Sequence, residues 1–301
     1  MWCLQESNQG HMDFQSIALP TELRHQRLLA AANIISILRY PNKNEKKAKC
    51  FFSFLQLCKM NLVIDAGNSF VKVAVFKGNS LLNDEQFELS EFVVRIKNIF
   101  KKYPNINRAI VSSVGSITDK ELKVLKLFCK VHQLSHVSKV PFKNSYATPQ
   151  TLGVDRIALA CAAFYHNPSG NTLIIDAGTC ITYDVVNDFG EYLGGAISPG
   201  LQMRYKALYQ QTSKLPLLEP EKEVNLIGNT TNSSIHSGVI NGVLAEINGL
   251  VDQYNQRFKD LTVILTGGDA LFLSERTKNT IFANPKFLLE GLNYLLEYNK
   301  K

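Results

Sequence analysis

The sequence predicts an α/β protein with two similar mixed domains that face each other across a cleft. One hairpin pattern occurs twice, as Leu62-Val-Ile-Asp-Ala-Gly-Asn68 and as Leu173-Ile-Ile-Asp-Ala-Gly-Thr179. Each copy is followed by two further strand-like segments and then by alternating helices and strands, which is the pattern of a mixed α/β domain. The chain has 301 residues, of which 45% are hydrophobic, and this is enough material for one or two cores.

The first domain is expected to span residues 60–168. Continuous or alternating apolar runs predict its strands, and apolar residues three or four apart predict its helices. The expected strands lie at 61–65, 70–76, 81–87, 108–113 and, as a short one, 134–138. The expected helices lie at 90–103, after Thr118, and at 157–165, the last one following a loop over 146–156.

The second domain is expected to span residues 169–301 and to repeat this opening. Its strands are predicted at 172–176, 180–187, 191–197 and 262–266, and its helices at 200–212, 234–257, 269–275 and 286–298. Gly267 and Gly268 follow a predicted strand and precede a helix. They could let a ligand such as adenosine approach the backbone, or they could simply form the turn.

The turns of the two hairpins contain residue types that bind phosphate. Gly67 permits close approach of a ligand, and successive N–H groups in a tight turn form a concavity that suits phosphate oxygens. Asn68, Ser69 and Thr179 add side-chain hydrogen-bond donors, and Lys72 adds a positive charge. The acid before the first turn suits Mg²⁺, which prefers one or two carboxylates together with water and phosphate oxygens. An ordinary hairpin is the alternative for either copy alone, but the repetition favours a ligand site.

The charge and cysteine content exclude several classes of function. The net charge is +7, but residues 1–59 supply +4 of it, so the main body gives little support for nucleic-acid binding. The six cysteines form no Cys-x-x-Cys pair, which fits the reduced thiols of a cytoplasmic protein better than a disulfide framework or a zinc site. No membrane association is expected, because the apolar run over 28–38 is only eleven residues long.

Residues 1–59 differ from the rest and are expected to be an over-extended start or a disordered appendage. They lack the order of features that marks a signal peptide. A lysine-rich polar run occupies 42–49, and Met60 stands directly before the first predicted strand. A basic targeting arm is the alternative for this segment.

Four motifs in combination, two of them the hairpin turns described above, indicate a particular protein family. They are Asp65-Ala-Gly-Asn-Ser-Phe-Val-Lys72, Gly153-Val-Asp-Arg156, Asp176-Ala-Gly-Thr179 and Gly194-Gly-Ala-Ile-Ser-Pro-Gly200. Together they resemble the type III pantothenate kinases, from the superfamily that includes actin, the heat-shock chaperone ATPases and the sugar kinases. The similarity covers residues 60–301, and the second motif is what distinguishes this family within the superfamily. It implies two actin-like (ribonuclease H-like) domains, each opening with a three-stranded antiparallel unit.

The resemblance implies the ATP-dependent phosphorylation of pantothenate to 4′-phosphopantothenate, the first step of coenzyme A biosynthesis. It also implies Mg²⁺, a monovalent cation (K⁺ or NH₄⁺) and a homodimer. At the matching positions, ATP would be bound by Asp65, Gly67, Asn68, Ser69, Lys72 and Thr179, with Mg²⁺ at Asp65 and the monovalent cation at Asp176. Asp155 would be the catalytic base. Pantothenate would be bound by Tyr146, Gly153, Val154, Asp155 and Arg156, and by Thr212 from the neighbouring subunit.

The residues themselves leave some of these roles open. Phosphoryl transfer needs in-line positioning, neutralised phosphate charge and an acceptor for the hydroxyl proton. Asp155, near a helix start, could be that acceptor, or it could only stabilise the helix N-terminus. Arg156 could pair with the carboxylate of pantothenate or with a protein acid. Tyr146 could serve only in packing, and Thr212 could only end its helix.

Two other functions are compatible with the predicted fold. One is another enzyme of the superfamily, such as a sugar kinase or a nucleotide phosphohydrolase, which would make Gly153-Val-Asp-Arg156 incidental. The other is a regulatory protein, a transcriptional accessory factor that has lost catalysis. The intact set of Asp65, Asp155 and Asp176 argues against that loss.

Overall fold

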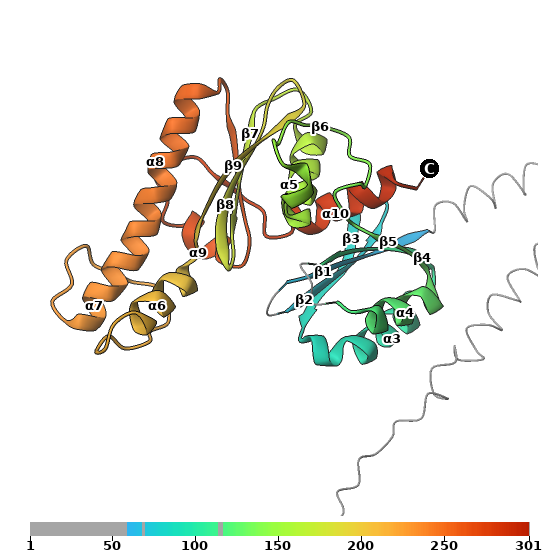
Figure 1. The fold of residues 1–301 in the computed structure, drawn as a ribbon, viewed down its shortest axis with the longest axis horizontal. Helices are drawn as coiled ribbons and strands as arrows, with labels where there is room; N and C mark the ends of the chain where they lie inside the picture. The colour runs from blue at the N-terminus through green and yellow to red at the C-terminus, as the bar shows by residue number, and fades with distance from the viewer. Residues whose placement is uncertain (1–58, 68–69, 114–116, 301) are drawn as a thin grey trace, which may run out of the picture.

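The computed structural model describes residues 59–67, 70–113 and 117–300, and its strands form two mixed sheets (Figure 1). The first sheet has the order β3-β2-β1-β4-β5, with β1 at Met60–Ala66, β2 at Val71–Lys77, β3 at Ser80–Phe87, β4 at Ile106–Ser113 and β5 at Lys130–Gln133. The second has the order β11-β10-β7-β8-β9-β6, with β6 at Lys143–Asn144, β7 at Thr172–Ala177, β8 at Cys180–Val186, β9 at Glu191–Pro199, β10 at Thr262–Thr266 and β11 at Phe282–Ala283.

The two sheets repeat one topology. In each sheet, three consecutive strands are antiparallel neighbours, namely β1-β2-β3 and β7-β8-β9. Two later strands then pair in parallel on the other side of the first one, as β4-β5 and as β10-β11. The short β6 extends the second sheet beyond β9. The predicted pair of similar actin-like domains, each opening with a three-stranded antiparallel unit, is confirmed.

The central strand β1 is buried on both of its faces, as its nearly continuous apolar sequence requires. Alternate side chains of a strand point to opposite faces. Leu62 and Ile64 therefore pack in the core beneath α3 (Phe92–Lys102) and α4 (Asp119–Phe128), whereas Val63 packs in a second core, which lies between the two sheets. The first sheet thus has helices on its outer face and the rest of the molecule on its inner face (Figure 1).

Two helices, α5 (Val154–His166) and α10 (Phe287–Tyr298), lie between the sheets and join them (Figure 1). Their buried side chains share one core with Val63 of the first sheet and Ile174 of the second. The helices touch closely because α10 has a glycine at the contact. A Cβ added at Gly291 would lie 2.0 Å from the carbonyl oxygen of Ala158 on α5.

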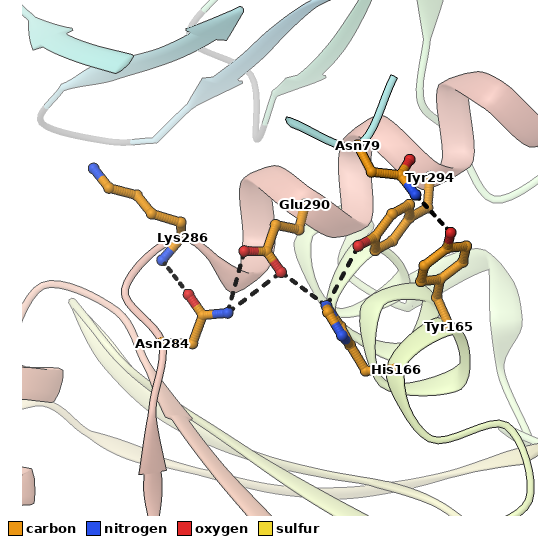
Figure 2. Close-up of polar contacts among 7 residues, drawn as sticks. All are labelled: Asn79, Tyr165, His166, Asn284, Lys286, Glu290 and Tyr294. Atoms are coloured by element: carbon orange, nitrogen blue, oxygen red, sulfur yellow. Dashed lines mark hydrogen bonds and ion pairs between the residues drawn. The ribbon is translucent and has the colours of Figure 1, made fainter. Parts of the chain in front are cut away.

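A chain of polar and aromatic contacts reinforces this junction (Figure 2). The ring of His166, the last residue of α5, lies 2.8 Å from a carboxylate oxygen of Glu290 on α10. The rings of Tyr165 and Tyr294 stack with their centroids 3.6 Å apart, and the Tyr165 hydroxyl accepts a hydrogen bond from Asn79 in the β2–β3 turn. The residues of this junction network are Asn79, Tyr165, His166, Asn284, Lys286, Glu290 and Tyr294. It connects elements from both halves of the chain.

The outer face of the second sheet is covered by α6 (Leu201–Gln210), α7 (Thr231–His236), α8 (Gly242–Arg257) and α9 (Ala270–Ser274). A five-residue π-helical turn, Ser237–Asn241, joins α7 to α8. The long helix predicted at 234–257 therefore exists, but it begins three residues earlier and contains this wider turn.

Most predicted elements are confirmed, and three details differ. The strand expected at 134–138 instead occupies Lys130–Gln133 (β5), because these residues pair with β4 and the following residues turn back into the core. The helix expected to begin at Ile157 begins at Val154, directly after Gly153. The two-residue strands β6 and β11 were not predicted, since they are too short to give a periodic signal. The expected start after Thr118 is confirmed, with a capping box formed by Thr118 and Glu121.

The division of the chain at residue 168 stays a prediction. β6 precedes that point but belongs to the second sheet, and α10 follows it but packs between the sheets. Within the described residues, no helix combines the length and hydropathy that a membrane span requires. The expectations for residues 1–58 fall outside the described part of the chain.

Candidate active site

A cavity of about 180 Å³ opens between the two halves of the chain, as the predicted fold requires. One wall comes from β2 and β3 and includes Lys72 and Asp84. The other wall comes from the turn after β10 and the residues before α10, and it includes Gly267, Gly268 and Lys286. Lys286 forms an ion pair with Asp84 across this space. The glycine pair noted in the sequence therefore faces the lysine of the first hairpin.

Asp65 and Asp176 occupy equivalent places at the ends of β1 and β7. Asp65 stands opposite Lys72 in the first hairpin. Burial raises the pKa of Asp65 to about 6; Lys72 opposes this shift and the nearby Asp155 adds to it. Burial also raises the pKa of Asp176 to about 7; Asp155 and Asp65 add to this shift and Lys72 opposes it. Three predicted site aspartates from distant parts of the chain are therefore close enough to repel one another.

Asp155 lies in the first turn of α5, where the helix begins after Gly153. Its Oδ1 accepts a hydrogen bond of 2.9 Å from the backbone N–H of Arg156. A Cβ at Gly153 would lie 2.3 Å from this oxygen, so the glycine makes room for the carboxylate. Val154 packs against the core between the sheets and fixes the helix start. The motif Gly153-Val-Asp-Arg156 thus holds an acid at a fixed place beside the two hairpin acids.

Arg156 pairs with a protein acid, which is one of the two partners that the sequence left open. Its Nε lies 2.9 Å and its Nη2 2.7 Å from Oδ1 of Asp184 on β8. The Tyr192 hydroxyl on β9 donates a 2.7 Å hydrogen bond to the same oxygen. The pair forms because Asp184 and Ile174 stand opposite each other in the β7–β8 register, on the face that packs against α5.

Neither Asp184 nor Tyr192 was predicted from the sequence as a site residue. A signal for the aspartate was available, because Asp184 is a lone acid in the apolar run from Ile181 to Val186. A charged residue in such a strand is buried only when it has a partner. Which partner it has depends on how α5 packs on the sheet, and this is not visible in the sequence.

Tyr146 packs beside this pair. Its ring centroid lies 5.7 Å from the Arg156 guanidinium carbon and 6.1 Å from the ring of Tyr192. Gly194 makes this position possible, because a Cβ there would lie 2.9 Å from the Tyr146 ring. Gly194 also has a φ of +94°, a conformation that favours glycine.

The remaining predicted site residues lie in three places. Thr179 is in the turn of the second hairpin, where its carbonyl accepts a hydrogen bond from Gly200, the last residue of the fourth motif. The hydroxyl of Thr212, just beyond α6, donates to the carbonyl of Leu208. The structure shows only such local contacts for Thr212 among the described residues. Gly67 lies in the first hairpin turn, and Asn68 and Ser69 fall outside the described residues.

The charges of the site fit the cations that the resemblance implies. Asp65, Asp155 and Asp176 repel one another, and Lys72 offsets only part of this repulsion. Among the described residues, no three His, Cys, Asp or Glu side chains converge to hold an ion by themselves. An ion at these carboxylates would therefore need ligands from water or substrate, which is the usual coordination of Mg²⁺ next to phosphates.

Comparison with known proteins agrees with this geometry. A protein from Christiangramia forsetii, named type III pantothenate kinase, is 52% identical over 241 residues, which cover 80% of this chain and 99% of that protein. A protein of the same name from Flavobacterium johnsoniae is 47% identical over 239 residues, covering 79% and 98%. A solved structure of a Baf-family protein from Campylobacter jejuni has a TM-score of 0.54 at 22% identity and covers 79% of this chain and 98% of that one, which supports the fold alone.

The family model described as "Type III pantothenate kinase" matches residues 61–253, which include both hairpins and all the predicted site residues. The chain therefore belongs to the type III pantothenate kinase family.

Proposed function

We propose that this protein transfers the γ-phosphoryl group of ATP to the primary hydroxyl of pantothenate and so catalyses the first step of coenzyme A biosynthesis. The observation that carries this proposal is the cavity between Lys72 and the Gly267-Gly268 turn, because predicted site acids adjoin both of its walls. Asp65 stands opposite Lys72 in the first hairpin, a Cβ on Gly267 would lie 2.4 Å from Oδ1 of Asp176, and Asp155 contributes to raising the pKa of both acids. The cavity would take part of ATP between the two halves, and the acids would hold the cations that phosphoryl transfer requires.

The first hairpin would bind the phosphates of ATP. Lys72 lies in the cavity wall and can neutralise phosphate charge, and Gly67 lets the backbone approach the phosphate oxygens. Asn68 and Ser69 would add hydrogen bonds in the same turn, and Thr179 would contact ATP from the second hairpin. Bound Mg²⁺ would neutralise phosphate charge during the transfer.

The two hairpin acids would divide the cations between them. Asp65 would hold Mg²⁺ together with phosphate oxygens and water, and Asp176 would hold K⁺ or NH₄⁺. Both carboxyl groups are buried beside other acids, so each is more stable next to a cation than alone.

Asp155 would accept the hydroxyl proton of pantothenate and orient the attacking oxygen. Because the transition state of phosphoryl transfer is loose, orientation matters as much as proton removal. The substrate would lie along the start of α5, in contact with Gly153, Val154 and Arg156, with the Tyr146 ring as one wall.

We also propose a homodimer formed by the segment after α6, in which Thr212 would reach the substrate of the partner subunit. Large apolar side chains are exposed in this segment: Leu226 is 79% and Ile227 is 84% exposed. A groove of about 810 Å³, lined in part by Leu208 and Ile235, lies beside them. Apolar surface of this kind marks an interaction site. Size-exclusion chromatography with light scattering tests this, with Ile227→Asp as the variant expected to give monomers.

Neither alternative function is favoured. If the protein were a sugar kinase, the match of the family model would be unexplained. The regulatory alternative gains no support from the Campylobacter structure, which is named for a family of transcriptional activators, because that likeness concerns the fold alone. A cytoplasmic location is proposed as well, and the free thiols of Cys161 and Cys180 are consistent with a reducing compartment.

A coupled assay of ADP release tests the activity. We expect turnover with pantothenate and none with a panel of hexoses and N-acetylhexosamines, in the presence of MgCl₂ and KCl, and mass spectrometry should identify 4′-phosphopantothenate. Turnover with a sugar and none with pantothenate would overturn the proposal.

A further inference from the structure

Asp184 is a fully buried acid that the reaction described above does not use. It has no exposed surface, and its Oδ1 accepts hydrogen bonds from Nε of Arg156 and from the hydroxyl of Tyr192, while Nη2 of Arg156 lies at an ion-pair distance of 2.7 Å. Arg156 is itself only 6% exposed. Burying such an ion pair costs desolvation free energy that an apolar pair of similar volume would not require. A purely structural role therefore explains the pair poorly.

The pair fixes the orientation of the guanidinium group. Nε is hydrogen-bonded to Asp184, Nη2 lies within ion-pair distance of the same oxygen, and the Tyr146 ring lies 5.7 Å from the guanidinium carbon. An arginine has five N–H donors in a rigid plane, and Nη2 has no hydrogen-bond partner among the described residues, so N–H donors remain for another group. The opposite end of the same residue is fixed too, since the backbone N–H of Arg156 is bonded to Asp155.

We propose that Asp184 is a positioning residue, which holds Arg156 so that its remaining N–H donors face the carboxylate of the substrate. The proposal rests on the function proposed above, because pantothenate carries one carboxylate and its hydroxyl must reach Asp155. Arg156 then pairs with a protein acid and with the substrate at the same time, through different N–H groups of one guanidinium group. The separation between the Asp155 carboxylate and the Arg156 guanidinium group would then select substrates in which the hydroxyl and the carboxylate are the same distance apart.

The test compares pantothenate with pantothenol, in which an alcohol replaces the carboxylate. In Asp184→Asn, the amide no longer balances the arginine charge and Arg156 loses its fixed orientation. We expect kcat/KM for pantothenate to fall on the order of 10²-fold, chiefly through KM. The value for pantothenol should change by only a few-fold, and KM for ATP should stay the same. The preference for pantothenate over pantothenol therefore falls by about tenfold or more.

Two further variants separate positioning from packing. Tyr192→Phe removes one hydrogen bond to Asp184 but keeps the ion pair, and it should cause a smaller loss of the same kind. Glu246→Gln is the matched control, because Glu246 also binds an arginine and a tyrosine, Arg204 and Tyr183, but on the other face of β8. It should leave the preference between the two substrates unchanged.

A double-mutant cycle completes the design. In an Arg156→Met background, Asp184→Asn should have no further effect on the substrate preference, since the group it positions is gone. Equal losses for pantothenate and pantothenol in Asp184→Asn, or an undiminished preference in a variant with normal KM for ATP, would overturn the inference. If Asp184→Asn does not fold, the same criteria apply to Tyr192→Phe. A wild-type enzyme that phosphorylates neither compound would instead refute the proposed function.

Discussion

At the scale of single residues, the proposed chemistry depends on Asp155. Its carboxylate is anchored by the N–H of Arg156 and lies near two further acids, which come from β1 and β7. We expect a base held in this way to orient the substrate hydroxyl without moving.

Asp155→Asn keeps the size and some of the hydrogen bonding of the side chain but removes the proton acceptor. We expect kcat for pantothenate phosphorylation to fall by about 10²–10⁴-fold, while the binding of ATP persists. Steady-state kinetics together with calorimetric titration of a non-hydrolysable ATP analogue measure the two effects. A near-normal kcat would mean that Asp155 only stabilises the start of α5.

The two hairpin acids should differ in the ion that they serve. Asp176→Asn should raise the K⁺ or NH₄⁺ concentration needed for half-maximal activity, because an amide coordinates a cation without neutralising its charge. Asp65→Asn should instead raise KM for MgATP. Activity is measured over a grid of KCl and MgCl₂ concentrations. If both variants shift both ion dependences equally, the division of roles is wrong.

The raised pKa values predict how stability varies with pH. The carboxyl groups of Asp65 and Asp176 ionise near 3.8 in the unfolded chain but near 6 and 7 in the folded protein. The folded state therefore binds more protons between these values, and the stability of the ligand-free protein should fall as the pH rises from about 4 to 7. The double variant Asp65→Asn, Asp176→Asn lacks these titrations.

Thermal unfolding in buffer without K⁺ or Mg²⁺ should show this difference. The Tm of the wild type should decrease more between pH 5 and pH 8 than that of the double variant, which should be the more stable protein at pH 8. Parallel curves for the two proteins would show that these acids are not strained in the folded state.

At the scale of elements, the contact of α5 with α10 determines how the two halves are joined. Gly291→Ala would place a methyl group 2.0 Å from the Ala158 carbonyl oxygen, so the helices would have to separate. We expect a loss in the free energy of unfolding of about 1–3 kcal/mol, measured by urea denaturation.

Gly249→Ala on α8 is the control, because nothing lies within 4 Å of a Cβ at that position. The higher helix propensity of alanine should make this variant equal to the wild type or more stable by up to about 1 kcal/mol. Equal destabilisation of both variants would show that the packing of α5 on α10 is not the cause.

At the scale of the whole molecule, all the proposed site residues lie after residue 60 in the chain, and the family model begins at residue 61. A protein that starts at Met60 should therefore fold and phosphorylate pantothenate with the kcat and KM of the full chain. Circular dichroism and the coupled assay test this expectation. An insoluble or inactive shortened protein would show that residues 1–59 are needed.

The sequence determined the repeated hairpins, nearly all helices and strands, and the family. These features are local. The spacing of apolar residues shows which side chains of a strand or helix are buried, and the hairpin turns require particular residue types. The sequence also pointed to Asp65, Asp155 and Asp176 as predicted site residues, because each stands in a short motif.

Only the tertiary structure decided which distant residues meet. Asp184 and Tyr192 became partners of Arg156 because α5 packs on one face of the second sheet, and α10 came to lie between the sheets although it ends the chain. The strand near 134 was placed four residues too late, since pairing with β4 outweighs the local apolar pattern. Such contacts depend on the packing of elements far apart in the chain, and no local pattern in the sequence records that packing.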